Sequence, residues 1–191
     1  EEIAQRAEYG KGTLYNYFPG GKDEMLYAVV DELYDDLCAL IDVSLPPSDP
    51  PPDRARFEYF IGRMFAYFSE RRELFAILMK EAHRMGFSDS QDRVRYFLRQ
   101  RGRLADALAR PIARAMEHGE LRALSAHAVA HMLLGNIQGC QMILALEDAT
   151  GTAQCGMGTD ARWQPGDAAR FVTTMLFDGL LSESARTPGG S

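Results

Sequence analysis

Apolar side chains recur at helical spacing along most of this sequence, and that pattern restricts the chain to an all-helical fold. The clearest stripe consists of Phe57, Phe60, Ile61, Met64, Phe65 and Phe68. Positions i, i+3, i+4, i+7, i+8 and i+11 lie on one face of an α-helix, so this stripe predicts an amphipathic helix. No segment alternates as a strand does, and no repeat is present. We therefore predict an all-α fold.

Turn signals divide the chain into separate helices. The triplet Pro19-Gly20-Gly21 and the five prolines within 44–53 cannot continue a helix. We expect a stop at Gly119, an N-cap at Ser125, and a kink or break at Pro111. The predicted longer helices cover 22–41, a segment including 57–68, 70–85, 91–118, 125–147 and 167–184, with a loop at 148–166.

Charge and cysteine content restrict the functional classes. The 191 residues carry a formal net charge of −6, which gives no general reason to expect nucleic-acid binding. The 3 cysteines contain no C-x-x-C pair, which favours a reducing, cytoplasmic environment over a disulfide framework. No apolar run approaches the roughly 20 residues that a membrane helix needs, so we expect no membrane association. DNA binding would require a local site.

Such a site is indicated at the N-terminus. The sequence Ile-Ala-Gln-Arg-Ala at 3–7 precedes Lys-Gly-Thr-Leu-Tyr-Asn-Tyr-Phe-Pro at 11–19 and Lys-Asp-Glu-Met at 22–25. This run of about 25 residues, long enough for a helix-turn-helix and the start of a third helix, resembles the DNA-binding region of the TetR/AcrR family of transcriptional regulators. The resemblance implies a truncated helix-turn-helix region with a connecting helix at 1–42, and a helical ligand-binding and dimerisation domain at 43–191. The family's first helix has no counterpart ahead of Glu1, so we expect it to be missing from this sequence.

The resemblance also implies which residues contact DNA. In a helix-turn-helix the second helix enters the major groove, and its first residues meet base edges. Tyrosine hydroxyls can donate to phosphates, and asparagine is suited to read adenine. The implied DNA-binding residues are Lys11, Gly12, Thr13, Tyr15, Asn16, Tyr17 and Lys22. The second glycine before Lys22 suggests a loose hinge. A plain helical hairpin with exposed tyrosines is the alternative.

The central helices are rich in aromatic residues and methionine, which fits either a core or a cavity for a flat apolar ligand. Most of these side chains are expected in the core. The candidate effector-binding residues are Phe60, Met64, Tyr67, Phe68, Met79, His83, Phe97, Arg101, Leu104, His131 and Asn136, with Gln138 as a further polar group.

Small residues predict a close helix contact near the C-terminus. Gly135 and Gly139 are four residues apart, which permits close packing either inside one subunit or across a dimer interface. Gly179 is a further small residue, in the last predicted helix, that would permit such close packing. The family resemblance favours a homodimer whose two helix-turn-helix regions bind the two halves of a palindromic DNA site. The candidate interface comprises Gly135, Gly139, Met142, Phe171, Met175, Leu176 and Gly179.

Other patterns carry less. His127 and His131 could share a helix face, but zinc needs a third ligand that the sequence does not offer, so we expect no metal and no cofactor. The seven arginines within 91–114 indicate a solvent-exposed helix face, and a secondary contact with DNA is the alternative. No nucleophile elbow or phosphate loop is present, so an enzyme is disfavoured.

These observations predict a cytoplasmic, homodimeric, ligand-responsive transcriptional regulator, more often a repressor in this family. A small apolar or aromatic effector would release it from a palindromic operator. Three alternatives stay open: a dimeric binding protein with impaired DNA binding, an activator, and a helical enzyme.

Overall fold

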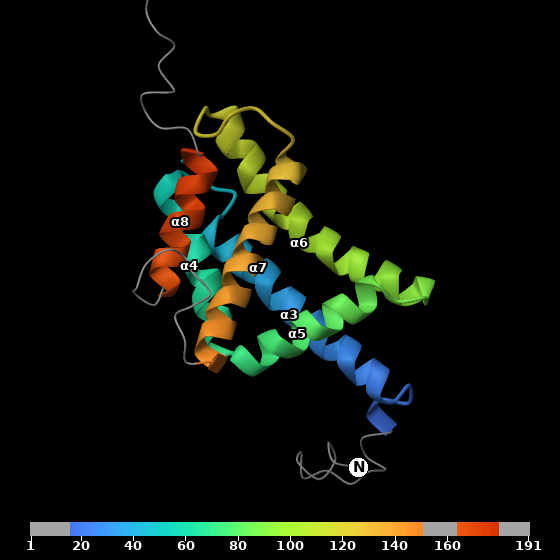
Figure 1. The fold of residues 1–191 in the computed structure, drawn as a ribbon. Coiled ribbons are helices and arrows are strands. Elements are labelled where there is room, and N and C mark those ends of the chain that lie inside the picture. The colour runs from blue at the N-terminus through green and yellow to red at the C-terminus, as the bar shows by residue number, and fades with distance from the viewer. Residues whose placement is uncertain (1–15, 151–163, 180–191) are drawn as a thin grey trace, which may run out of the picture. The chain divides into compact units, whose positions relative to one another are not determined.

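The computed structural model describes residues 16–150 and 164–179, and over these residues it is helical without strands (Figure 1). The predicted all-α fold is confirmed. The helices are α3 (Lys22–Ser44), α4 (Arg54–Glu70), α5 (Arg72–Gly86), α6 (Gln91–Glu117), α7 (Ala126–Thr150) and α8 (Pro165–Phe177).

Capping groups set several of these boundaries. The Asp53 side chain accepts a hydrogen bond from the backbone N–H of Arg56 at 2.9 Å, which starts α4 directly after the proline-rich loop. Ser125 caps α7 as predicted, through its hydroxyl and the N–H of Ala128. Gly119 follows α6 with φ +79°, a left-handed conformation that suits glycine.

Several predicted helix boundaries differ from those of the structure. α6 runs without a break through Pro111, which is buried inside the helix, because the packed apolar face outweighs the lost backbone hydrogen bond, so the predicted break is absent and the kink stays a prediction. α7 continues to Thr150, beyond the predicted end at 147. α8 begins at Pro165, two residues before the predicted start at 167, because Gln164 and Asp167 form a reciprocal capping box. The last helix also ends earlier, with Asp178 as its C-cap, although 180–184 lie outside the described residues.

The chain divides into two compact units, Glu1–Asp36 and Leu37–Ser191. α3 contributes to both, since its residues from Leu37 onward belong to the second unit. The division predicted at residue 42 lies within this helix and stays a prediction.

The core of the second unit is built around α4. Phe57, Phe60, Ile61 and Phe65 have no exposed surface, so the sequence stripe corresponds to the buried helix face. α8 lies alongside α4 (Figure 1). A Cβ atom placed on Gly62 would meet the Cβ atom of Ala169 at 3.8 Å, so small residues allow this close approach.

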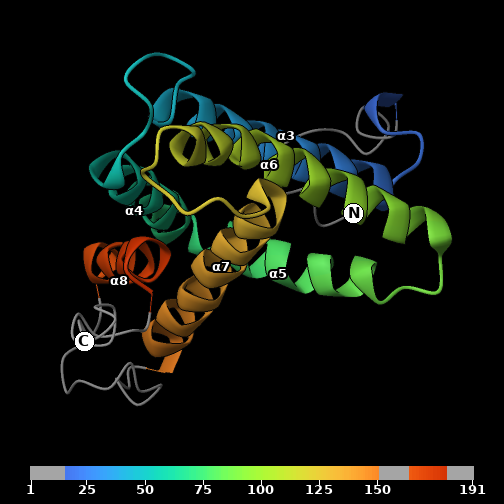
Figure 2. The same ribbon diagram turned by 90° about the horizontal axis from the view of Figure 1, so that it is seen from above.

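The remaining helices complete the bundle. α5 and α6 are joined by a short connection and run in opposite directions (Figure 2), while α7 packs on α6, α4 and α8. Residues Ala126–Glu147 of α7 are long and apolar enough to cross a membrane, by length and composition alone. Because one face of this stretch is buried against the other helices, we interpret it as a core helix.

Candidate functional site

A tight turn precedes α3 and presents its first residue. The N–H of Gly21 donates to the carbonyl oxygen of Phe18 at 2.9 Å, and Gly21 has φ +70°. The N–H of Gly20 donates to Oε2 of Glu24 at 2.7 Å, in the first turn of α3. Only glycine adopts this positive φ readily, so the second glycine closes a hydrogen-bonded turn instead of forming the loose hinge that we expected.

This turn lies beside the described part of the predicted DNA-binding surface. Asn16 and Tyr17 form a short helical end and are exposed, and Lys22 is exposed at the start of α3. The remaining predicted residues, Lys11, Gly12, Thr13 and Tyr15, lie outside the described residues. The assignment of all seven to DNA contact stays a prediction.

Most predicted apolar effector residues are in the core or at its edge. Phe60, Met64, Phe68 and Leu104 are buried, whereas Tyr67, Met79 and Phe97 are partly exposed. The rings of Tyr67, Phe68 and Phe75 form a continuous series of edge contacts with centroid separations of 5.3 and 5.0 Å. These aromatic side chains pack against one another, so they contribute to the hydrophobic core.

A polar connection that includes two predicted effector residues, Arg101 and Met79, joins three helices. Nη1 of Arg101 in α6 donates to Oε1 of Gln138 in α7 at 3.4 Å. Nε2 of Gln138 in turn donates to the sulfur of Met79 in α5 at 3.3 Å. The structure therefore brings together one cation, one amide and one thioether from three helices.

The other polar candidates lie elsewhere. His83, His131 and Asn136 are exposed, and the ring of His83 lies 4.7 Å from that of Phe87. Nε2 of His127 lies 3.2 Å from Oδ1 of Asp106, and in the part of the chain that is described no three metal-ligating side chains gather. His127 and His131 thus have no visible third ligand among these residues.

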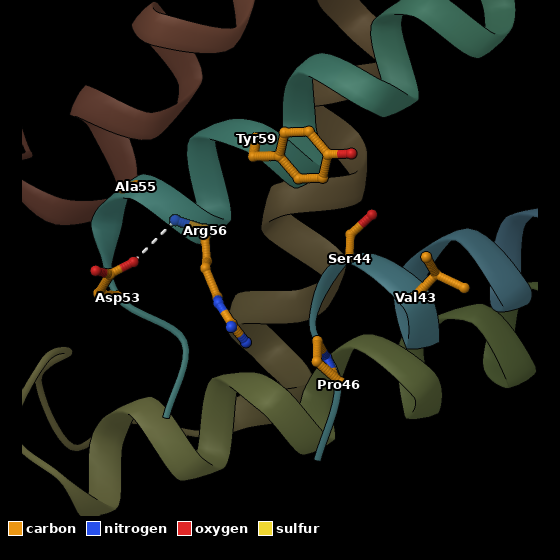
Figure 3. A pocket seen from close by; sticks show the side chains of 7 residues that line it. All are labelled: Val43, Ser44, Pro46, Asp53, Ala55, Arg56 and Tyr59. Atoms are coloured by element: carbon orange, nitrogen blue, oxygen red, sulfur yellow. Dashed lines mark hydrogen bonds between the residues drawn. The ribbon is translucent and has the colours of Figure 1, made fainter. Parts of the chain in front are cut away.

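Two surface grooves are formed by described residues of the second unit. The α3–α4 groove, of about 420 Å³, is shown in Figure 3. Its lining residues are Val43, Ser44, Pro46, Asp53, Ala55, Arg56 and Tyr59. The second groove, of about 640 Å³, is lined by residues between Met116 and Leu124, by Val129 and Met132 of α7, and by 175–179, which include the predicted interface residues Met175, Leu176 and Gly179. Neither groove contains a predicted effector-binding residue.

The predicted dimer residues of α7 face away from the protomer. Gly135 and Gly139 are exposed, and a Cβ atom added to either would meet nothing within 4 Å. Close packing of these glycines inside one subunit, the alternative that the sequence left open, is therefore not what the structure shows. Large apolar side chains are also exposed on α7 and α8: Met132, Met142 and Leu146 of α7 and Phe171 of α8. Gly179, by contrast, follows the end of α8 with φ +67°. This left-handed backbone conformation, which other residues rarely adopt, accounts for a glycine at this position.

Sequence reasoning missed several contacts that fix the second unit. Arg54 binds Asp178, and Nε2 of Gln141 donates to the carbonyl oxygen of Phe65 at 3.0 Å. Arg114 donates to the carbonyl oxygens of Pro46 and Ser48 and to Asp49. No local sequence signal marks these partners, because each pair is far apart along the chain.

Comparison with solved structures shows the same fold in three regulators. PfmR from Thermus thermophilus, a TetR family transcriptional regulator, has a TM-score of 0.66 and 19% identity, over 94% of this chain and 87% of that chain. A Clostridium perfringens protein described as a fatty acid metabolism regulator has a TM-score of 0.71 and 18% identity, over 95% and 88%. A TetR/AcrR regulator from Thermobifida fusca has a TM-score of 0.61 and 16% identity, over 94% and 85%. At these identities the likeness concerns the fold.

The family match comes from the N-terminal segment. Residues 1–29 match the family model described as bacterial regulatory proteins, tetR family, and this range contains every predicted DNA-binding residue. No curated protein matches the sequence. Residues 1–29 are thus similar to the tetR family of bacterial regulatory proteins, and the chain shares its fold with three regulators.

Proposed function

We propose that this protein is a regulator of the TetR family, namely a cytoplasmic homodimeric repressor that a small apolar or aromatic effector releases from a palindromic operator. The family match over residues 1–29 is the observation that carries the proposal. The exposed side chains of Asn16, Tyr17 and Lys22 beside a hydrogen-bonded turn support a DNA-contacting role for this segment. Lys22 would neutralise a phosphate at the positive end of α3.

The polar connection of Met79, Gln138 and Arg101 supports an effector site in the helical bundle. It joins side chains of α5, α6 and α7. An apolar effector with one hydrogen-bonding group would bind in such surroundings, because a few polar groups in an apolar pocket set the orientation of a ligand.

The exposed surface of α7 and α8 supports a homodimer. Its two exposed glycines would let a partner helix approach closely, and its exposed methionines and phenylalanine would be covered. A two-fold dimer presents two DNA-binding segments, which is why we propose a palindromic operator.

The proposed switch has two states. An effector that binds one arrangement of the bundle more tightly shifts the population toward that arrangement, by an amount set by the difference in affinity. α3 provides the covalent connection, since it begins in the first unit and ends in the second. The shifted dimer would no longer engage both half-sites together.

Fluorescence anisotropy with the DNA upstream of the protein's own gene tests the DNA-binding part. We expect specific binding that weakens steeply with salt and survives competition by a scrambled duplex. Lys22→Ala should reduce the slope of log affinity against log salt by about one, as expected for one lost phosphate contact. Lys80→Ala, which removes a lysine of α5, is the matched control and should leave the slope unchanged.

Binding that ignores sequence, or an identical effect of the two lysine substitutions, would contradict the proposed site. Titration of the protein–DNA complex with candidate effectors tests the second part. An effector that binds the bundle without changing operator affinity would contradict the switch.

A further inference from the structure

The α3–α4 groove contains a cation that the proposed function does not use. Val43 and Ser44 come from the last turn of α3, Pro46 follows that helix, and Ala55, Arg56 and Tyr59 come from the first turns of α4 (Figure 3). All these residues belong to the second unit. Figure 3 shows the side chain of Arg56 running away from Asp53 into the space beside Pro46.

The guanidinium of Arg56 is incompletely satisfied. Its Nη1 atom is buried, and none of the described residues accepts a hydrogen bond from it. A buried donor without a partner is costly, and the cost is larger for a charged group, so such an atom in a folded protein requires an explanation. An anion bound from solution would supply the missing acceptor.

Two other arginines, Arg54 and Arg114, differ from Arg56 because their guanidinium groups have carboxylate partners. Arg54 binds the carboxylate of Asp178 at 2.7 Å, and Arg114 binds the carboxylate of Asp49 at 2.9 Å. Asp53, the acidic residue in the groove, accepts instead from the backbone N–H of Arg56 and caps α4. The carboxylates of Asp178, Asp49 and Asp53 therefore bind other donors, and an acceptor for Nη1 of Arg56 would have to come from a ligand.

We propose that the α3–α4 groove binds a small carboxylate with an apolar body, separately from the effector site in the bundle. The carboxylate would accept from Arg56, and the apolar body would cover the exposed side chains of Val43 and Tyr59, which are 81% and 56% exposed. The groove volume of about 420 Å³ falls within the range of ligand pockets, roughly 300–1,000 Å³.

The charges of the groove favour a singly charged anion over a phosphate. Arg56 is the cationic side chain of the lining, and the exposed carboxylate of Asp53 lies on the same lining. A doubly charged oxyanion would need more donors and would be repelled by Asp53, whereas one carboxylate matches one guanidinium. The predominantly apolar remainder of the lining favours a ligand that is larger than acetate.

Calorimetric titration with sodium benzoate tests this proposal on the full chain, with ionic strength held constant by sodium chloride. We expect one benzoate per chain at the groove and no comparable binding of benzyl alcohol, which has the ring without the charge. Arg56→Met keeps an unbranched apolar side chain and removes the charge, and should weaken benzoate binding about 10- to 100-fold. Arg101→Met, in the bundle, should leave the groove affinity unchanged.

A charge pair at Val43 makes the test independent of how well Arg56→Met folds. Val43 is exposed, so both Val43→Asp and Val43→Lys should fold normally. The acidic variant should weaken benzoate binding and the basic variant should strengthen it.

The contradicting results are equally specific. Equal binding of benzoate by wild type and Arg56→Met, or a loss of binding only in Arg101→Met, would overturn the groove assignment. Benzyl alcohol binding as well as benzoate would overturn the role of the carboxylate. Failure of these tests leaves the DNA-binding proposal unaffected, since that proposal depends on operator affinity and on Lys22.

Discussion

The Nη1 atom of Arg54 lies 2.7 Å from the Oδ2 atom of Asp178, so a salt bridge joins the first turn of α4 to the residue that follows α8. Nη2 of Arg54 also approaches the hydroxyl of Thr174 at 3.3 Å, and the guanidinium lies 5.9 Å from the ring centre of Phe177. These contacts tie the C-terminal helix to the core helix α4.

A double-mutant cycle measures this contact. Arg54→Ala and Asp178→Ala should each lower the free energy of unfolding modestly, with a coupling energy of about 0.5–1 kcal/mol, because solvent screens a partly exposed pair. Urea unfolding of the two single variants and the double variant gives the coupling. The pair Asp92 and Arg95, 3.9 Å apart and both exposed, is the control and should show no measurable coupling. Additive effects at 54 and 178 would contradict the prediction.

The buried stripe of α4 should dominate the stability of the second unit. Phe60 has no exposed surface, so Phe60→Ala should lower the free energy of unfolding by roughly 3–5 kcal/mol through lost burial and a cavity. Ile77→Ala, at a side chain that is half exposed, should change it by less than about 0.5 kcal/mol. Chemical denaturation compares the two, and similar values would contradict the observed core.

Gly139 should separate protomer stability from dimer stability. Gly139→Ala should stabilise α7 by about 0.5–1 kcal/mol, because an added Cβ meets nothing within the protomer. Gly139→Leu should instead weaken the dimer by about ten-fold or more, or ~1.4 kcal/mol, if a partner helix approaches there. Sedimentation velocity reports the oligomeric state. Gly102→Leu, at another helical glycine with open space around it, should leave that state unchanged.

Gly21 should be required for the turn before α3. Gly21→Ala places a Cβ at φ +70°, which costs roughly 1–2 kcal/mol and should weaken operator binding by disturbing the turn that presents Lys22. Gly21→Asn should retain more affinity, because asparagine tolerates the left-handed region. Anisotropy titrations of both variants test this, and equal affinities of the two variants would contradict it.

Cys140 should make stability depend on alkaline pH. Burial raises the pKa of the Cys140 thiol, so the unfolded chain loses this proton at lower pH than the folded chain. Its contribution to stability is therefore full at neutral pH and falls as the pH rises through the unfolded and then the folded pKa. Wild type should lose stability more steeply than Cys140→Ala in urea unfolding at increasing alkaline pH. Parallel curves for the two proteins would contradict this.

Helical periodicity predicted the central helices well, because an amphipathic stripe needs only local spacing to be recognised. The stripe from Phe57 to Phe68 is the buried face of α4. The sequence allowed either a kink or a break at Pro111, and the helix has no break, because the local cost of a proline is outweighed by packing that the sequence does not show.

The candidate sites were predictable to different degrees. The N-terminal segment was recognised from its ordered run of residues, and the family match covers the same run. Of the effector residues, Arg101 and Met79 are joined through Gln138, whereas His83, His131 and Asn136 are exposed. Periodicity cannot make this distinction, because it gives the face of one helix without the position of its neighbours.

The sequence by itself determined the helical class, the proline-rich break before α4 and the resemblance of the N-terminal segment to the tetR family, because each depends on residues close together in the chain. Only the tertiary structure decided that Arg54 and Arg114 have carboxylate partners while Nη1 of Arg56 has none among the described residues. It also decided that Gly135 and Gly139 face outward. Partners 124 residues apart, such as Arg54 and Asp178, meet only after the helices have packed.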